Sequence, residues 1–396
     1  MTTPARKQYL DIKNHHRDEI LLFRMGDFYE TFDDDAKLVS QELEIALTSK
    51  EMGKGVKVPL AGIPFHSLET YLPKLIDGGH NVAICEQTSD PSNSKGIVDR
   101  AVVRVVTPGT IVEDSLLQES SNNYLASAVV RDTMAGLAFI DITTSEFFTT
   151  EIPKDKLYSE IDRFTPRELI IPEEMVSEIP SYVSVKKTAT PGSIFHPKWS
   201  VEALKEHFEV LSLEPYGCEN MPLACQAAGA IIDYIGKNNR RALASINSLQ
   251  TYSIESFMVL DEQTRRNLEL FSGGRWDSKA ASLFSILDNT NTPMGARMLR
   301  KWVGQPLLDV SILTKRQDSI QWFIENPEAR QYTRSILKGV SDIERLITRV
   351  MSNTATPRDL FAIRQSLQVC PQLIDRLSNN MGALLRNWLL DGISDY

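Results

Sequence analysis

The spacing of hydrophobic and polar positions changes along the chain, and the first part mixes two periods. Short apolar runs between charged or turn residues predict strands, and stretches with apolar residues every three or four positions predict helices. The predicted strands are 19–23, 56–60, 81–87 and 100–107, and the predicted helices are 33–47 and 67–77. Pro59 should confine the strand 56–60 to a sheet edge. We therefore predict a mixed α/β domain over residues 1–107.

A turn and a polar segment separate this domain from the next. Thr107-Pro108-Gly109-Thr110 is a turn signal, and an acidic, polar stretch follows it to Asn123. Residues 124–150 alternate as strands do, and residues 224–235 form a strongly apolar helical run. We predict a linker over 108–123 and an α/β domain with a small sheet over 124–250.

From residue 251 to residue 396 the pattern is mainly helical. The stretches with helical spacing are 261–270, 279–287, 294–303, 312–325, 340–351, 357–366 and 372–377. A repeat of about 20–50 residues is not evident, so the sequence does not predict a solenoid. The predicted fold class is a multidomain α/β plus all-α chain.

The composition supports several globular domains. At roughly 100–200 residues per domain, 396 residues correspond to two to four domains. With 42% hydrophobic and 24% charged residues the chain can bury sizeable cores, which excludes a wholly disordered protein. The sequence has no run of 18 apolar residues, and residues 1–10 lack the apolar segment of a secretory signal. We therefore expect a cytoplasmic protein without a membrane span.

Charge and cysteine content exclude further classes. The 43 basic and 52 acidic residues give a net charge of −9, whereas nucleic-acid-binding domains are usually basic. Residues 1–107 contain 13 basic and 16 acidic residues, so any affinity of this domain for a nucleic acid should be weak and salt-dependent. The four cysteines are scattered and form no C-x-x-C pair, which argues against a zinc knuckle or a disulfide scaffold.

The sequence lacks the common catalytic motifs. It contains no Walker A motif G-x-x-x-x-G-K-[ST], and no G-x-G-x-x-G, H-E-x-x-H or G-x-S-x-G. Asp33-Asp34-Asp35 is better explained by the positive N-terminal end of a helix than by a bound cation. We therefore expect these residues to form no enzyme active site and to hold no cofactor or metal.

The segment with the most distinctive composition is 24–30, which reads R-M-G-D-F-Y-E. It follows the first predicted strand, and Gly26-Asp27 is a turn signal. Composition alone predicts a turn that enters a helix, with aromatic side chains packed in the core.

The same segment resembles the mismatch-binding motif of the MutS family of DNA mismatch repair proteins. Further blocks resemble that family in the same order: V-P-L-A-G-I-P-F-H (58–66), V-A-I-C-E-Q (82–87), V-V-R-V-V-T-P-G-T (102–110), A-F-I-D-I-T-T-S-E-F (138–147), T-R-R-N-L-E-L (264–270), L-D-N-T-N-T-P-M-G-A-R-M-L-R-K-W (287–302) and D-I-E-R-L-I-T-R-V (342–350). The resemblance covers essentially the whole chain. It implies a mismatch-binding domain over 1–107, a connector domain over 124–250 and the first part of a helical core or lever domain over 251–396.

The resemblance also implies roles for two residues. Phe28 occupies the position that enters the DNA minor groove and stacks on the mispaired or unpaired base. An apolar wedge of this kind unstacks a base step and kinks the duplex, and a mismatched step is easier to open. Glu30 occupies the position that forms a hydrogen bond with the displaced base, and its charge should disfavour correctly paired DNA. Tyr29 is expected to face the domain core.

Other residues near the motif are candidates for contacts with the DNA backbone, which would position the duplex without reading its sequence. They are Arg24, Met25, Asp27, Lys54, Lys57, Lys95, Arg100 and Arg104. For each cation taken singly, an ordinary solvated charge explains its presence at least as well, and Met25 could equally pack beneath the loop.

The block 292–302 predicts an amphipathic helix that the resemblance assigns to a lever. In this helix we expect Arg297, Arg300 and Lys301 to be surface charges, and Met294, Met298, Leu299 and Trp302 to pack in the core.

In the family, the chain continues into a clamp and an ATPase domain. We therefore expect this sequence to be the N-terminal part of a longer protein. By resemblance, that parent protein uses ATP and Mg²⁺, forms a homodimer, is associated with the bacterial nucleoid and recruits a MutL-type partner.

Three functions remain open at this point. The first is a sensor that binds double-stranded DNA with mismatches or small loops. The second is a docking scaffold whose connector domain binds a MutL-type partner. The third is a paralogue that binds branched DNA, which the presence of both Phe28 and Glu30 disfavours.

Overall fold

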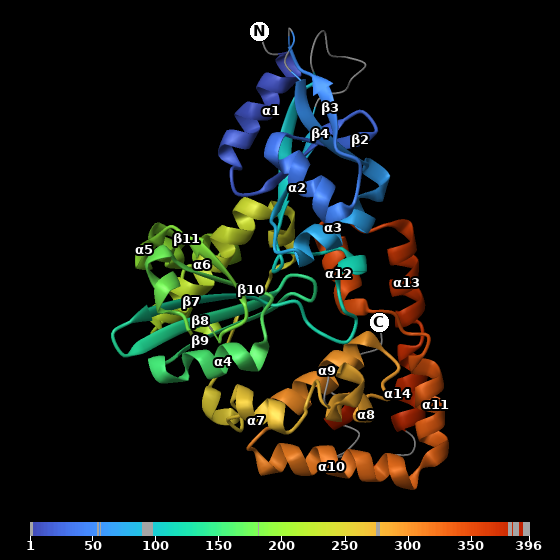
Figure 1. Ribbon diagram of the computed structural model, residues 1–396. Coiled ribbons are helices and arrows are strands. Elements are labelled where there is room, and N and C mark those ends of the chain that lie inside the picture. Colours follow the sequence, from blue (N-terminus) through green and yellow to red (C-terminus); the bar gives the residue numbers. More distant parts are fainter. Residues whose placement is uncertain are drawn as a thin grey trace.

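The computed structural model describes residues 3–53, 55, 57–88, 98–180, 182–274, 278–378, 382 and 388–390. The chain forms three parts that follow one another in sequence (Figure 1). An α/β domain lies at one end of the molecule, a second α/β domain lies next to it, and a group of helices forms the remainder.

The first domain is built on a six-stranded sheet with the order β3-β4-β2-β1-β5-β6. Its strands are β1 (Ile20–Met25), β2 (Phe28–Phe32), β3 (Thr48–Glu51), β4 (Lys57–Pro64), β5 (Val82–Gln87) and β6 (Arg100–Val106). All neighbouring strands are antiparallel except β1 and β5, which are parallel. The hairpin β1–β2 therefore lies in the middle of the sheet.

Helices cover both faces of this sheet. Helix α1 (Pro4–His15) packs on one face through Tyr9, which is buried against Phe23 and Phe32. Helices α2 (Asp33–Leu43) and α3 (Leu68–Asp77) supply the buried residues of the other face. Because both faces are covered, successive residues of the central strands are apolar instead of alternating with polar ones.

The second domain contains another six-stranded sheet, with the order β11-β10-β7-β8-β9-β12. Its strands are β7 (Leu125–Arg131), β8 (Met134–Asp141), β9 (Glu146–Pro153), β10 (Glu168–Pro172), β11 (Lys186–Thr190) and β12 (Gln250–Thr251). Strands β7, β8 and β9 form an antiparallel meander, whereas β10, β11 and β12 join by parallel pairing. The sheet is therefore larger than the small sheet that the sequence predicted.

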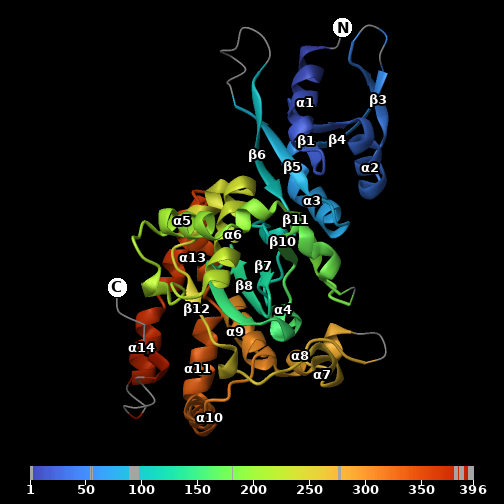
Figure 2. The ribbon, with the colours of Figure 1, turned by 90° about the vertical axis from the view of Figure 1, so that its left-hand side faces the viewer.

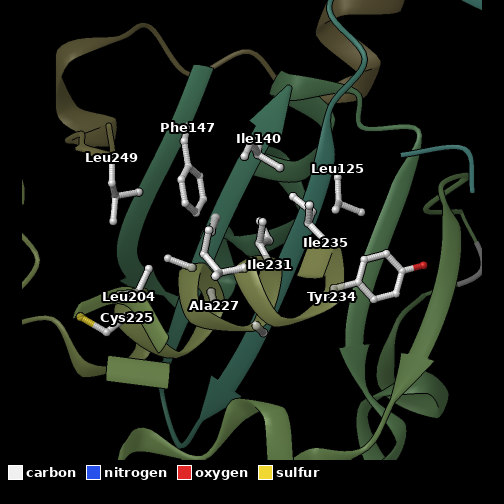
Figure 3. Packing of buried hydrophobic residues seen from close by; sticks show 14 of the residues in the cluster. Leu125, Ile140, Phe147, Leu204, Cys225, Ala227, Ile231, Tyr234, Ile235 and Leu249 are labelled. Atoms are coloured by element: carbon white, nitrogen blue, oxygen red, sulfur yellow. The ribbon is translucent and has the colours of Figure 1, made fainter. Parts of the chain in front are cut away.

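The apolar helix α6 (Pro222–Asn238) packs across one face of this second sheet (Figure 3). Ile231 and Ile235 of α6 point toward Leu125 and Ile140 of the strands. Helix α5 (Pro197–Phe208) lies beside α6, and α4 (Leu157–Phe164) covers the opposite face. The domain thus has three layers, with α5 and α6 on one face of the sheet and α4 on the other. An apolar core lies on each side of the sheet.

The third part is helical in the residues that the structure describes. Its helices are α7 (Glu262–Asn267), α8 (Leu283–Leu287), α9 (Pro293–Gly304), α10 (Val310–Glu325), α11 (Pro327–Leu337), α12 (Ile343–Met351), α13 (Pro357–Leu367) and α14 (Cys370–Ser378). Helix α10 crosses the end of the molecule farthest from the first domain, and α12 lies closest to that domain (Figure 1). Figure 2 shows α7 and α8 beside α4 of the second domain.

The segment between the two α/β domains is held by side chains of the second domain and of the helical part. Arg345 of α12 donates hydrogen bonds to the backbone oxygens of Gln118 and Ser121, and Arg297 of α9 donates one to that of Glu119. At the start of the segment, the buried carboxylate of Glu168 accepts a hydrogen bond from the Gly109 N–H. The predicted linker is therefore bound to the second domain and to the helical part.

Two local predictions are wrong. Residues 28–32 form the strand β2 instead of entering a helix, because Phe28 pairs with Met25 across the turn. The following helix ends at Leu43 instead of residue 47, because Glu44 adopts the left-handed conformation with φ of 56°. In β4, pairing with β2 begins only at Leu60, so Pro59 pairs with β3 alone and lies where the strand is open on its other side, as expected for a proline.

The prediction for the amphipathic helix α9 is also wrong in part. Arg297 is buried, with ion pairs to Asp342 and Glu344, whereas Met298 and Trp302 are exposed. Partner carboxylates on α12 make burial of the arginine favourable, and this pairing lies outside the reach of helical periodicity.

Candidate nucleic-acid interface

The motif 24–30 forms a tight hairpin in the centre of the first sheet. Residues Gly26 and Asp27 make the turn, and Gly26 has a φ of 59°, which glycine adopts without steric penalty. The N–H of Phe65 donates to the backbone oxygen of Asp27 at 2.9 Å, which ties the turn to the end of β4. Phe28 is therefore held on a short, paired segment instead of a free loop.

The alternation of side chains along β2 separates Phe28 and Glu30 from Tyr29. Residues two apart in a strand share a face, so Phe28 and Glu30 lie on the face of Phe32, which α1 covers through Tyr9. Phe28 lies beyond this contact and is 47% exposed. Tyr29 points to the other face and is buried, as predicted. An exposed aromatic side chain at a rigid strand end is suited to insertion into another molecule.

The opposite face of the hairpin is fixed by polar contacts. The hydroxyl of Tyr29 donates to Glu86 of β5, and burial, together with this carboxylate, raises the pKa of Tyr29. The guanidinium carbon of Arg24 lies 3.7 Å from the ring centroid of Phe65 and its Nη1 lies 3.7 Å from Glu86. Arg24 therefore supports the hairpin from the face opposite to Phe28.

Glu30 is paired with a lysine that the sequence analysis did not single out. Lys50 Nζ of the edge strand β3 lies 2.9 Å and 2.8 Å from the two carboxylate oxygens of Glu30. The Glu30 side chain is 16% exposed, so its carboxylate lies near the surface beside Phe28. The sequence offers no short-range signal for this pair, because it depends on how β3 pairs with β4.

Only some of the residues predicted to contact the DNA backbone lie on the face of the sheet that carries Phe28. Met25 pairs with Phe28 across the hairpin and is half-buried in the α1-side core. Arg100 lies 5.0 Å above the Phe23 ring and donates to Gln8 and to the backbone of Arg24, so it also belongs to the α1 side.

The remaining candidates lie elsewhere or outside the described residues. Arg104 pairs with Ile84 of the other core and forms an ion pair with Glu113, which places it away from Phe28. The side chain of Asp27 and that of Lys57, at the start of β4, are exposed. Lys54 and Lys95 lie outside the described residues.

Two further features bear on the kind of site. Within the described ranges, the structure contains no cluster of three or more metal-ligating side chains of histidine, cysteine, aspartate or glutamate. A helix of sufficient length and apolar character to cross a membrane is likewise not found among them.

Comparison with protein families assigns each of the three parts. Residues 3–115 match the family model "MutS domain I", residues 123–247 match "MutS domain II" and residues 263–391 match "MutS domain III". The chain is therefore a series of three family domains, with the hairpin of Phe28 in the first. It belongs to the MutS family.

Curated relatives agree with this assignment. A protein named "DNA mismatch repair protein MutS" from Dehalococcoides mccartyi (strain CBDB1) is 45% identical over 367 residues, which are 93% of this chain and 43% of the relative. Proteins of the same name from Halothermothrix orenii and Methanosarcina barkeri are 42% and 41% identical, over 97% and 100% of this chain and 44% and 46% of the relatives. The chain thus spans less than half the length of these relatives.

Proposed function

We propose that this chain recognises mispaired or unpaired bases in double-stranded DNA as part of DNA mismatch repair. In this proposal Phe28 enters the minor groove and stacks on the affected base, and Glu30 accepts a hydrogen bond from it. The proposal rests on the positions of Phe28 and Glu30 on the same face of β2. Phe28 is exposed and Glu30 lies near the surface, whereas Tyr29 between them is buried on the other face.

The physical basis is the energy needed to open a base step. A wedge unstacks the step that it enters and kinks the duplex, and a mismatched step requires less energy to open than a paired one. The site therefore selects deformable DNA and needs no contact that depends on base identity. A rigid hairpin supports this role, because a wedge held by strand pairing loses little conformational freedom on binding.

Fluorescence anisotropy tests the proposal. A duplex with one G·T pair or one unpaired T is compared with its matched homoduplex at low salt. We expect the chain to prefer the mismatched duplex and Phe28→Ala to lose this preference, since base–aromatic stacking contributes about 1–3 kcal/mol. Phe361→Ala is the matched control, because Phe361 is also exposed but lies on α13.

Two outcomes would oppose the proposal. If Phe28→Ala kept the full preference, the wedge assignment would be wrong. If Phe28→Ala unfolded the first domain, as circular dichroism would reveal, the side chain would be a core residue.

A second candidate function is docking of a protein partner on the connector domain. Two large apolar side chains of this domain are unusually exposed, since Trp199 of α5 is 72% and Leu211 is 97% accessible to solvent. Exposed apolar side chains mark an interaction surface where they form a contiguous patch, so Trp199 and Leu211 are the residues to test. By family resemblance the partner would be a MutL-type protein, and loss of its binding in Trp199→Ala would support this function.

We further propose, from the resemblance alone, that the longer parent protein binds ATP and Mg²⁺ and acts as a homodimer. The three domains matched here are the part of the family that precedes its ATPase domain.

A further inference from the structure

A cavity lies between the connector domain and the helical part, away from the hairpin of Phe28. Its volume is about 290 Å³, and its walls come from the end of α4, from α9 and from the residues around α7. Figures 1 and 2 both place α4 next to these helices. The connector and the helical part therefore line this space jointly.

The lining of the cavity is strongly cationic. Arg163 and Arg167 come from the connector domain, and Arg265, Lys279, Arg300 and Lys301 come from the helical part, with Arg297 behind them. Among the described lining residues none is acidic. The other polar side chains include the amides of Gln118, Asn122 and Gln305, which can also donate hydrogen bonds.

Carboxylates outside the cavity neutralise only some of these cations. Arg163 pairs with Glu160 at 2.5 Å, and Lys301 pairs with Glu146 at 3.3 Å. Arg297 pairs with Asp342 and Glu344 of or beside α12.

Four cations are left without such a partner. Within the part of the chain that the structure describes, no carboxylate lies within 4 Å of the charged groups of Arg167, Arg265, Lys279 or Arg300. The guanidinium of Arg265 donates only to backbone oxygens, those of Asp162, Arg163 and Gly304. Several positive charges therefore face one small space, and Asp162 and Glu160 offset part of the charge of Arg265 without lining that space.

Burial makes the charges of Arg265 and Arg300 unfavourable, whereas Arg167 and Lys279 are exposed. It lowers the pKa of Arg300, whose guanidinium carbon lies 4.2 Å from the ring centroid of Phe271. Burial, followed by the charge of Arg163, lowers the pKa of Arg265 to about 10. The Nε atoms of Arg163, Arg265 and Arg297 are buried and lack an acceptor among the described residues. An anion in the cavity would relieve this cost.

We propose that the cavity binds a compact phosphate anion with several charges, of which pyrophosphate is the simplest example. Guanidinium groups bind phosphate oxygens through paired hydrogen bonds, and a cluster of them favours a multiply charged phosphate over a single carboxylate. The cavity has roughly the volume of ten water molecules in the liquid, which is enough for such an anion. The anion would join Arg163 and Arg167 of the connector to Lys279 and Arg300 of the helical part. This inference does not depend on the proposed recognition of DNA.

Isothermal titration calorimetry of the chain with pyrophosphate, at constant ionic strength, tests the proposal. We expect saturable binding that is at least tenfold tighter than binding of inorganic phosphate or sulfate. Arg300→Gln and Lys279→Gln should each weaken pyrophosphate binding about tenfold. Arg266→Gln is the matched control, because Arg266 is the exposed neighbour of Arg265 on α7 and does not line the cavity.

The remaining arms of the experiment identify the source of the phosphate and the outcomes that would overturn the proposal. Tighter binding of Mg²⁺-free ATP than of pyrophosphate, weakened by the same variants, would identify a nucleotide as the ligand. Absence of saturable pyrophosphate binding, or binding unchanged in Lys279→Gln and Arg167→Gln, would overturn the proposal. These two side chains are exposed, so both variants should fold even if Arg300→Gln does not. Binding of a polyglutamate peptide without a response to pyrophosphate would indicate an acidic protein segment instead.

Discussion

Lys50 Nζ lies within 3 Å of both carboxylate oxygens of Glu30, at 2.9 Å and 2.8 Å. The pair lies on the face of the first sheet that also carries Phe28, so a cation accompanies the carboxylate proposed to meet a base. This arrangement explains how a carboxylate can approach a polyanion, because Lys50 offsets its charge at short range. If Glu30 binds a base as proposed, Lys50 would be free to donate to a phosphate.

Lys50→Gln should therefore weaken binding to mismatched and matched duplexes by similar factors. We expect a loss of about 2- to 10-fold for each and a smaller salt dependence, since removing a cation that faces phosphate acts on all sequences alike. Glu30→Gln should instead change the ratio between the two duplexes. Anisotropy titrations at two salt concentrations measure both quantities. Lys37→Gln is the control, because Lys37 is an exposed lysine on α2 paired with Asp34. A changed ratio with unchanged affinity for homoduplex in Lys50→Gln would contradict this role.

Glu168→Gln should destabilise the connector domain and the segment that enters it. The buried carboxylate accepts hydrogen bonds from Thr188 and Tyr234 on one oxygen and from Thr107 and Gly109 on the other. In glutamine an NH2 group replaces one of these oxygens, so two of the four donors lose their acceptor. Each buried donor without an acceptor costs about 1–3 kcal/mol. Urea unfolding followed by circular dichroism measures the loss. Tyr234→Phe removes a single donor and should lose less, so an equal or larger loss there would refute the explanation.

Gly136→Ala should destabilise the same domain by a steric mechanism. A Cβ atom at Gly136 of β8 would lie 2.0 Å from the backbone oxygen of Leu223 at the start of α6. Forcing extra atoms into such a contact costs about 1–3 kcal/mol or more, because backbone must move. Gly236→Ala is the control, since Gly236 lies within α6 and its added Cβ meets only Leu243 at 3.5 Å. We expect that variant to be as stable as the parent or more stable, because alanine is the better helix former.

Acid should weaken the contact between α9 and α12. Burial alone would raise the pKa of Asp342, but the hydrogen bonds and charge of Arg297, with a contribution from Arg345, lower it below the usual aspartate value. A carboxyl whose pKa is lower in the folded chain stabilises the fold above its unfolded pKa of about 3.9, and the contribution is lost as pH falls below that value.

Asp342→Asn should remove this part of the acid dependence and, near pH 7, cost about 1–3 kcal/mol, because Arg297 loses one of its two carboxylate partners and keeps Glu344. Thermal unfolding between pH 7 and pH 3 measures both effects. Asp34→Asn, at an exposed ion pair, should leave the profile unchanged. A steep acid dependence retained in Asp342→Asn would assign it to other groups.

The sequence correctly predicts the helices and strands in which buried residues recur at a single regular spacing. The helix at 67–77, the apolar helix around 224–235 and the strand near 81–87 are confirmed, since each has a single apolar stripe or a fully apolar run. Strand β2 was mistaken for the approach to a helix because Tyr29 and Phe32 are buried on opposite faces, which removes the alternation that marks a strand. Helix α11 was not predicted.

The candidate site depends more on tertiary pairing than on local pattern. Composition alone favoured a core position for the aromatic residues of the motif, and this holds for Tyr29 but not for Phe28. The roles of Phe28 and Glu30 came from the family resemblance and stay predictions. Lys50 was not found because its distance from Glu30 is set by the register of β3 on β4. Arg104 was counted as a backbone contact because its partner Glu113 lies in another part of the fold.

The packed segment between the first two domains has a mechanical consequence. Its backbone oxygens at Gln118, Glu119 and Ser121 are bound to arginines of α9 and α12. Because these hydrogen bonds hold the stretch, it has little slack between the first domain and the helical part. The same two arginines meet at the start of α12, where Asp342 caps the helix and forms an ion pair with Arg297. We therefore expect a rotation of the first domain to be transmitted to α9 and α12 through the side chains of Arg297 and Arg345.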